Sequence, residues 1–422
     1  MRRVIQVEER PPLGEAIPLS LQHLFAMFGA SVLVPSIFGI NPSVVLFMNG
    51  IGTLLYIFLT KGKAPAFLGS SFAFITPTLI IIGNPSLGYR YATAGFAVSG
   101  LLFCVFALII KKFGSKWIDI VLPPAAMGPV IALIGLELSG TAASTGGMIP
   151  ADGAGIDPKN AAVFLVTLGV AVFGSVVFRK FLGVIPILMA IIVGYLTAIC
   201  LGIIDFSAIS NASVLAMPNF QLPLFDFSAI MIILPATLVV LSEHIGHQLV
   251  TSQVVGRDII KEPGLHRTLL GDGLSTAISG LVGSVPTTTY GENIGVMAIT
   301  KVYSVWVIGG AAVLSILIAF VGKISAAIQT VPGPVMGGVS FLLYGMIASS
   351  GIRLLVDSKV DYSKSKNLSL TSVVFVVGLS GISVGLGSVE LTGMALATVV
   401  GMLLSLVFYF LDRWKLTNDS AS

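Results

Sequence analysis

Long apolar stretches follow one another along almost the whole chain, and this feature restricts the fold more than any other. Fourteen can be placed, and most approach the roughly 20 residues that a helix needs to cross a bilayer. They cover residues 17–39, 43–60, 65–83, 92–110, 120–138, 160–178, 182–203, 228–250, 268–284, 288–300, 303–322, 328–348, 369–386 and 389–411. Charged residues make up only 10% of the sequence, whereas soluble domains usually carry about 25%. We therefore expect an all-α polytopic membrane protein without a folded soluble domain.

The basic residues support both the number of spans and their orientation. If the N-terminus is cytoplasmic, all but Arg90, Lys159 and Lys323 of the 23 Lys and Arg residues fall in loops on the cytoplasmic side. One miscounted span would assign every later loop to the wrong side of the membrane and destroy this bias. We therefore expect both termini at the cytoplasmic face of the plasma membrane. No apolar run precedes Pro11 and Pro12, so we expect no cleavable signal peptide.

Two of the stretches, 65–83 and 288–300, are poor membrane spans. Their polar or helix-breaking residues are Ser70, Ser71, Thr76 and Pro77 in the first and Gly291, Glu292 and Asn293 in the second. Pro286 is expected to stop the helix before the second, and the threonines that follow it favour extended backbone. Pro77 is expected to end the extended piece that starts at Ser70. We predict that spans 3 and 10 are broken by short extended (β) segments, which can pair with each other.

A weak internal repeat relates the two halves of the chain. Met127, in a Pro- and Gly-rich stretch, has a counterpart in Met336, 209 residues later. Gly69-Ser70 similarly matches Gly283-Ser284, and Gln22-His23 matches Glu243-His244. The matches fall in spans 5 and 12, 3 and 10, and 1 and 8. A repeat of seven spans places its second copy upside down, so we expect the 7+7 inverted repeats of a secondary transporter.

Span eight carries the ionisable residues that are most costly to place in a membrane. Glu243 and His247 are four residues apart and share one helical face, whereas His244 points elsewhere and is interpreted as a packing residue. A carboxylate and an imidazole in one cavity can accept, hold and release a proton. A structural ion pair between helices is the alternative interpretation. Metal ligation is disfavoured, because the two cysteines and four histidines show no ligand spacing.

Glu292 lies at the start of a predicted half-helix, where the positive end of the helix dipole stabilises an anion. Unwound backbone beside it would leave amide groups free for a ligand. A cavity with two carboxylates and free amides suits a small, planar, neutral molecule that has N–H donors and carbonyl acceptors. It suits an anionic substrate badly.

Several motifs together resemble one known family. The segment Glu292–Lys301 resembles the signature of the nucleobase–ascorbate transporter (nucleobase:cation symporter-2) family, and Gln22-His23 resembles its motif in span one. Leu68–Phe74, Glu243–His247 and Thr289–Asn293 also read as in that family, closest to its bacterial uracil-transporting branch. The resemblance covers essentially the whole chain. It implies a proton-coupled importer of uracil with no cofactor.

The resemblance also implies roles for single residues. Glu243 and Glu292 would bind the pyrimidine, and the backbone of Phe72 and Gly291 would meet its carbonyl groups. The remaining residues with implied roles are Tyr290, packed nearby; Tyr344 in span 12, facing the substrate; His247 with Glu243, in proton coupling; and Gln22, His23 and Asn293, in support.

In proteins that the chain resembles, spans 1–4 and 8–11 form a core domain. Spans 5–7 and 12–14 form a gate domain that also mediates homodimerisation. Carried over, this division assigns residues 1–118 and 226–325 to the core domain and residues 119–225 and 326–422 to the gate domain with the cytoplasmic tail.

Several sequence features disfavour other functions for this chain. A xanthine or urate permease of the same family generally opens the signature with Gln, where this chain has Glu292. An anion exchanger of the same architecture is opposed by the two carboxylates. A membrane enzyme would need a nucleophile or metal motif, and no GxSxG or HExxH pattern stands at a span end. A channel is disfavoured by the inverted repeat. No metal or nucleic-acid partner is expected.

Two further carboxylates are given no role in the site. Glu137, near the outer end of span 5, is interpreted as an interfacial or gate-hinge residue. Asp272 is expected near the start of span nine, where it would cap that helix or pair with Arg267.

Overall fold

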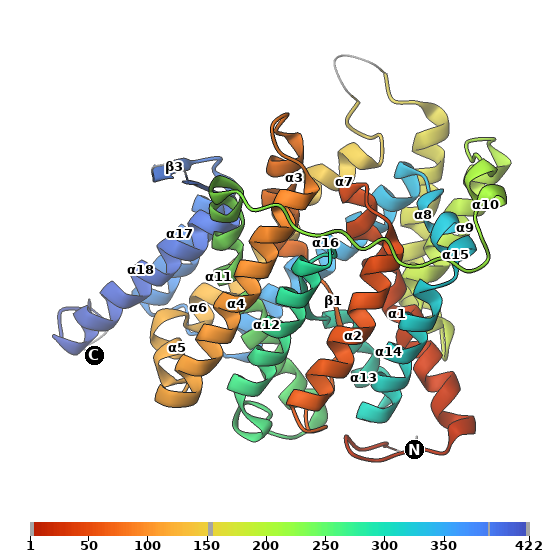
Figure 1. Cartoon of the computed structure of the whole chain (residues 1–422). Helices are drawn as coiled ribbons and strands as arrows, with labels where there is room; N and C mark the ends of the chain where they lie inside the picture. The colour runs from red at the N-terminus through yellow and green to blue at the C-terminus, as the bar shows by residue number, and fades with distance from the viewer. Residues whose placement is uncertain (1–3, 151–154, 387–388, 419–422) are drawn as a thin grey trace.

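The computed structural model describes residues 4–150, 155–386 and 389–418. Most of its long helices run side by side from one face of the molecule to the other, and a short strand, β1, lies near the middle (Figure 1). Within these residues, eight helices are long and apolar enough to cross a membrane, and four shorter apolar helices accompany them. The expectation of a polytopic helical membrane protein is confirmed.

The long helices pack in two groups. In the first group, α4 and α12 lie against each other, and α2 packs against both α12 and α14. This group consists of α1 (Leu13–Phe38), α2 (Pro42–Leu59), α4 (Tyr89–Phe113), α11 (Phe227–Val255), α12 (Leu265–Leu281) and α14 (Val305–Ala319). All six overlap expected spans.

The second group is built around α16, which packs against α6 and α8. Its members are α6 (Pro124–Glu137), α8 (Pro158–Val177), α9 (Pro186–Cys200), α16 (Gly333–Asp357), α17 (Ser365–Leu379) and α18 (Gly393–Arg413). The groups meet where α11 touches α6 and α18, and where α1 touches α9 and α16.

Shorter elements complete the described chain. Two half-helices, α3 (Ile75–Gly83) and α13 (Gly291–Thr300), follow the strands β1 (Leu68–Ser70) and β2 (Thr287–Thr289), with the 3-10 turn η1 (Phe72–Phe74) between β1 and α3. The others are α5 (Lys116–Val121), α7 (Ser139–Thr145), η2 (Leu182–Val184), α10 (Ser207–Asn211), the π-turn η3 (Ile260–Gly264), α15 (Gly322–Gln329), β3 (Ser383–Leu386) and β4 (Val389–Thr392).

The helix boundaries follow from residues with capping chemistry. The Asn41 side chain accepts a hydrogen bond from the backbone of Ser43 at the start of α2, and Asp226 caps α11 by accepting from Ala229. Such caps satisfy amides that would otherwise lack a partner. Gly39 and Gly256 end α1 and α11 in the left-handed conformation that glycine adopts without strain.

The two last expected spans differ from the observed helices. The predicted stretches 369–386 and 389–411 include β3 and β4, which pair as an antiparallel hairpin, so α17 ends at Leu379 and α18 begins only at Gly393. Gly381 has φ +73° and turns the chain out of the helix. Hydropathy measures apolar character and does not report this change of backbone conformation.

The first described residues form a strap across one end of the molecule. Ile5 and Val302 form a parallel bridge, and the Val305 amide donates to the carbonyl of Val7 at 2.9 Å. Ile5 and Val7 are buried. Glu8 pairs with Arg257 at 2.5 Å, just beyond the end of α11. The strap therefore ties the N-terminal segment to the loop between α13 and α14 and to the end of α11.

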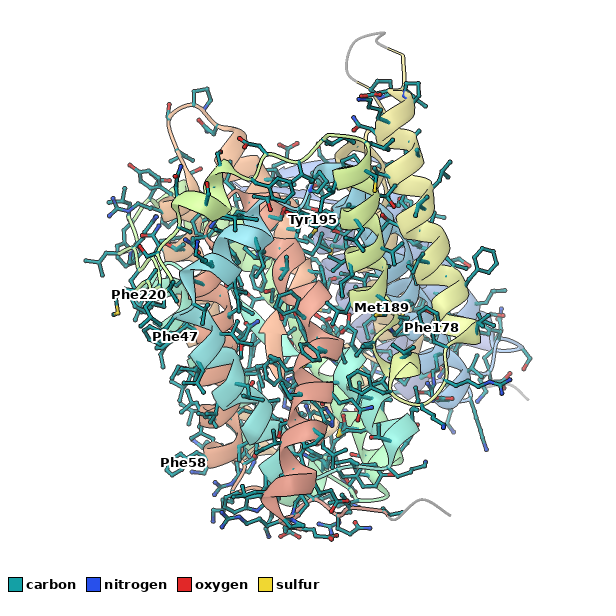
Figure 2. All side chains as sticks on the ribbon, turned by 90° about the vertical axis from the view of Figure 1, so that its right-hand side faces the viewer. Phe47, Phe58, Phe178, Met189, Tyr195 and Phe220 are labelled. Atoms are coloured by element: carbon teal, nitrogen blue, oxygen red, sulfur yellow. The ribbon has the colours of Figure 1, made fainter. Side chains whose placement is uncertain are left out.

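Large apolar side chains cover much of the outside of the molecule. In Figure 2, Phe58 and Phe220 project at one edge of the helices, and both are exposed. A soluble protein rarely exposes apolar surface on this scale, whereas lipid tails solvate it well. The surface therefore agrees with a membrane environment.

Candidate functional site

A cavity of about 450 Å³ lies between the two helix groups. Its walls come from α1 and α11, from the segments that contain β1 and β2, and from α8, α9 and α16. Glu243, His247, Phe72, Gly291 and Glu292 all line it. The structure thus brings together residues that lie more than 200 positions apart in the sequence.

The two strands pair with each other beside the cavity. β1 and β2 run antiparallel with Gly69 opposite Thr288, and the Tyr290 amide continues the ladder by donating to the Phe67 carbonyl at 3.0 Å. On the other side, the Ser71 amide donates to the Pro286 carbonyl at 2.9 Å. The prediction that the broken spans pair through short extended segments is confirmed.

Two details of that prediction and one match of the internal repeat were wrong. α12 ends at Leu281, and the turn at Gly283, with φ +81°, precedes Pro286, so the proline is not what stops the helix. Pro77 lies in the first turn of α3, where its missing amide costs little, and does not end the extended segment. Gly283-Ser284 lies in the turn before β2, whereas Gly69-Ser70 lies within β1, so these dipeptides are not structural counterparts.

Glu243 and His247 share the face of α11 that lines the cavity, as their spacing predicted. Glu243 is only 5% exposed, and its Oε2 atom has no hydrogen-bond partner among the described residues. An unpartnered buried carboxylate oxygen is costly, and a ligand that donates a hydrogen bond would remove the cost. His247 Nδ1 lies 3.2 Å from the Thr289 hydroxyl, so the imidazole contacts β2.

Glu292 lies in the first turn of α13 and also lines the cavity. Gly291 starts this half-helix, and a side chain there would begin 3.4 Å from His247 Nε2. The residue before it, Tyr290, is buried, and its ring lies directly over Gly69, where an added Cβ atom would come within 2.2 Å. The tyrosine ring therefore fixes β2 against β1.

Phe72 and Tyr344 form an aromatic contact between the helix groups. Phe72 begins η1 and lines the cavity. Tyr344 of α16 is buried and packs edge-on against the Phe72 ring, with centroids 5.8 Å apart. Tyr344 is not among the cavity-lining residues, so it reaches the cavity only through Phe72.

The predicted supporting residues lie behind α13. The Asn293 side-chain amide donates to His23 Nδ1 at 2.9 Å and so joins α13 to α1. Both residues are buried. Gln22 is also buried but does not line the cavity. On α1, Ala26 reaches the cavity wall.

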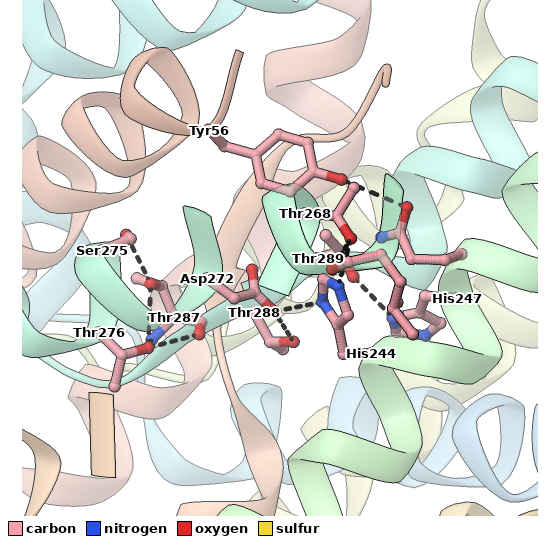
Figure 3. A network of polar contacts seen from close by, with 12 residues as sticks. Tyr56, His244, His247, Thr268, Asp272, Ser275, Thr276, Thr287, Thr288 and Thr289 are labelled. Atoms are coloured by element: carbon pink, nitrogen blue, oxygen red, sulfur yellow. Dashed lines mark hydrogen bonds and ion pairs between the residues drawn. The ribbon is translucent and has the colours of Figure 1, made fainter. Parts of the chain in front are cut away.

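A buried polar network joins α11, α12 and β2 (Figure 3). His244 Nδ1 lies 2.6 Å from Asp272 Oδ2, which also accepts from the Thr288 hydroxyl at 3.1 Å. The expectation that Asp272 caps α12 or pairs with Arg267 was wrong, because Asp272 lies within α12 and faces α11. His244 is a buried residue, as expected, and it also holds β2 through Asp272.

The other ring nitrogen of His244 also has a partner. The Thr268 hydroxyl donates to the Leu265 carbonyl at 3.0 Å, so it accepts from His244 Nε2, also at 3.0 Å. His244 and Asp272 thus form a buried hydrogen-bonded pair that joins α11 to α12. One sequence signal points to it: Thr268, Asp272, Ser275 and Thr276 are spaced along one side of an otherwise apolar helix.

Among the described residues, no group of three or more His, Cys, Asp or Glu side chains is placed to hold a metal ion. The cavity instead offers hydrogen-bond acceptors on two carboxylates and an imidazole, and backbone donors at the starts of two helices. A helix start presents unpaired amides. This arrangement can bind a neutral molecule that has both donors and acceptors.

The membrane-spanning helices, the paired half-helices and the polar cavity between the two groups have the architecture of a membrane transport protein. The model of the Permease family, the xanthine/uracil permeases, matches residues 14–386. The chain belongs to this family. The resemblance to nucleobase:cation symporter-2 transporters is confirmed.

Similar proteins cover nearly the whole chain. The uracil permease of Escherichia coli (strain K12) is 58% identical over 407 residues, which are 96% of this chain and 94% of the relative. The uracil permease of Paenibacillus larvae is 58% identical over 420 residues, 99% of each chain. The transmembrane domain of the cyanobacterial bicarbonate transporter BicA has the same fold, with a TM-score of 0.67 at 15% identity over 96% of this chain and 99% of that chain.

Proposed function

We propose that the protein imports uracil across the plasma membrane by proton symport and alternating access. The observation that carries the proposal is the buried, unpartnered carboxylate oxygen of Glu243 in a cavity that Glu292 also lines. Two relatives that are 58% identical over almost the full chain are uracil permeases, and this supports the choice of substrate.

Uracil is complementary to the polar groups of the cavity. Its two N–H groups would donate to Glu243 and Glu292, and its two carbonyls would accept from the backbone amides of Phe72 and Gly291. A pyrimidine that lacks one carbonyl would leave a buried amide unpaired, at a cost of about 1–3 kcal/mol. We therefore expect sharp selection against cytosine.

Proton coupling follows from the cost of moving charge through a membrane. Uracil is neutral, so an ionised Glu243 would leave net charge in the cavity during the crossing. Protonation of Glu243, or of His247 beside it, would favour the loaded state. We propose that one proton accompanies each uracil molecule.

For the transport cycle, we propose that the fourteen expected spans form 7+7 inverted repeats. Residues 1–118 and 226–325 would be the core domain, and residues 119–225 and 326–422 the gate domain. The packing of the helices in two groups supports this division. We also propose a homodimer through the gate domain, with both termini in the cytoplasm.

The cavity is unequal at its two ends. Its lining extends to Ser175 on α8 and Arg353 on α16, near helix ends that are expected to be cytoplasmic. On the opposite side, a cavity of about 30 Å³ lies between Thr76 of α3 and Glu137 of α6. Glu137 also accepts from the Met394 amide of α18 at 2.7 Å. We infer an inward-facing conformation closed near Glu137.

The test is uptake of radiolabelled uracil into proteoliposomes with an inward proton gradient. The native chain should accumulate uracil, xanthine should not compete, and Glu292→Gln should abolish uptake. Glu262→Gln is the matched control, because it removes a carboxylate in the exposed loop between α11 and α12. Both variants are purified and reconstituted at equal density.

Two outcomes would change the proposal. Competition by xanthine would move the protein to the purine branch of the family. Uptake that does not respond to the pH gradient would contradict proton symport, even if uracil is the substrate.

A further inference from the structure

A second, smaller cavity lies at the surface where the ends of α2, α4 and α12 meet. It measures about 130 Å³ and is lined by Leu59, Ala107, Leu108, Lys111, His266, Arg267 and Leu270. It shares no lining residue with the large cavity between the helix groups. Its floor is apolar, and its basic residues come from two neighbouring helices.

Within the described parts of the chain, the basic groups of this cavity have no acidic partners. No carboxylate of the described residues lies within ion-pair distance of Lys111, His266 or Arg267, and none lines the cavity. Arg267 Nη1 donates to the Leu59 carbonyl at 3.1 Å, and this contact holds the guanidinium at the rim. The nearby Glu262 is already paired with Lys63. Uncompensated positive charge around one hollow is complementary to an anion.

An apolar track leads away from the same cavity along α4. Leu101, Val105 and Leu108 recur at helical spacing and are 57%, 48% and 60% exposed. They end one turn before Lys111, in the last turn of the helix. A free anion would gain nothing from this track, whereas an acyl chain would bury part of it.

We propose that the cavity binds the headgroup of an anionic phospholipid, whose chain lies along the α4 track. Arg267 and Lys111 contact the phosphate, and His266 donates to it. Basic hollows between membrane helices at the level of the headgroups suit this class of lipid. The site is separate from the transport cavity and is independent of the identity of the transported substrate.

The test is lipid binding to the delipidated full chain, measured by native mass spectrometry with phosphatidylglycerol and, separately, phosphatidylcholine. We expect phosphatidylglycerol to bind more tightly. Lys111→Glu changes two unit charges at an exposed position and should weaken that binding about 25-fold. Leu108→Ser should weaken it too, because the chain loses its apolar contact. Both positions are exposed, so both variants should fold.

Lys112→Glu is the matched control, because Lys112 is adjacent and exposed but does not line the cavity. The proposal is overturned if the two lipids bind equally, or if Lys112→Glu weakens binding as much as Lys111→Glu. It is also overturned if inorganic phosphate displaces phosphatidylglycerol and Leu108→Ser has no effect, since the ligand would then be a free anion.

Discussion

Glu243 and His247 face the same cavity with different chemistry, and the spacing of four residues on α11 places them together. Glu243 offers an unpartnered carboxylate oxygen, whereas His247 is held against Thr289 of β2. A permanently neutral amide at position 243 would resemble the protonated carboxyl group in shape and charge. Substitution there can therefore separate binding from coupling.

We expect Glu243→Gln to retain exchange of uracil across proteoliposomes without a gradient. It should lose accumulation driven by a pH gradient, which reaches about tenfold per pH unit when one proton accompanies each substrate. Counterflow and gradient-driven uptake of labelled uracil measure the two properties. Full accumulation by this variant would assign the coupled proton to His247.

The His244–Asp272 pair supports a prediction about stability. Removal of one member of a buried hydrogen-bonded pair leaves the other polar group without that partner, at a cost of about 1–3 kcal/mol. We expect Asp272→Asn and His244→Gln each to lower the unfolding temperature in detergent strongly. The loss of unfolding free energy in the double variant should be smaller than the sum of the losses in the two single variants, by at least about 1 kcal/mol. Strict additivity would contradict a direct interaction between the two side chains.

At the scale of single residues, the sequence predicted which side chains line the cavity better than it predicted which side chains contact each other. Glu243 and His247 were identified because both lie on one helix, where spacing determines the shared face. Asp272 was placed wrongly because its partner is 28 residues away on another helix, and no local pattern reports that contact. Tyr344 was predicted to face the substrate. Its position behind Phe72 depends on tertiary packing, which the sequence pattern does not report.

Among the elements, the β1–β2 pair depends on a glycine. Gly69→Ala would drive a Cβ atom into the Tyr290 ring, and overpacking of this kind typically costs about 1–3 kcal/mol. We expect lower thermal stability and loss of uracil binding, because Tyr290 leads directly into Gly291 and Glu292. Equilibrium binding and thermal unfolding measure both effects.

Gly140→Ala is the control for that substitution, since an added Cβ atom at Gly140 meets nothing within 4 Å. Equal loss of binding in the two variants would show that alanine acts through general destabilisation and not through the ring contact.

The paired strands could be predicted from the sequence, since three threonines in succession favour extended backbone and an isolated extended segment cannot persist inside a membrane. The ends of the helices were harder to predict from the sequence. Helix ends at Leu281 and Leu379 depend on turns at Gly283 and Gly381, and each lies within or next to an apolar stretch that hydropathy treats as continuous.

At the scale of the whole molecule, the N-terminal strap gives stability a dependence on pH. The hydrogen bond from Arg257 holds the pKa of Glu8 below its ordinary value of 4.5. The pair therefore stabilises the folded state above about pH 4.5, and this contribution is lost as the pH falls through the lowered pKa. We expect the unfolding temperature of the native chain to fall between pH 5 and pH 3 more than that of Glu8→Gln.

The difference should be small, at most about 1 kcal/mol, because the pair is exposed. Thermal unfolding in detergent at several pH values measures it. A steeper fall in Glu8→Gln than in the native chain would contradict the assignment.

The pairing of Gly69 with Thr288 also has a consequence for biosynthesis. At about 5–20 residues per second, a ribosome needs roughly 10–40 seconds to make the chain between these two positions. During that time β1 has already been synthesised, but its partner strand does not yet exist. The first half must therefore wait beside the insertion machinery with an unpaired edge. Factors that shield polar backbone in nascent membrane proteins should act on this chain in that interval, before any transport site has formed.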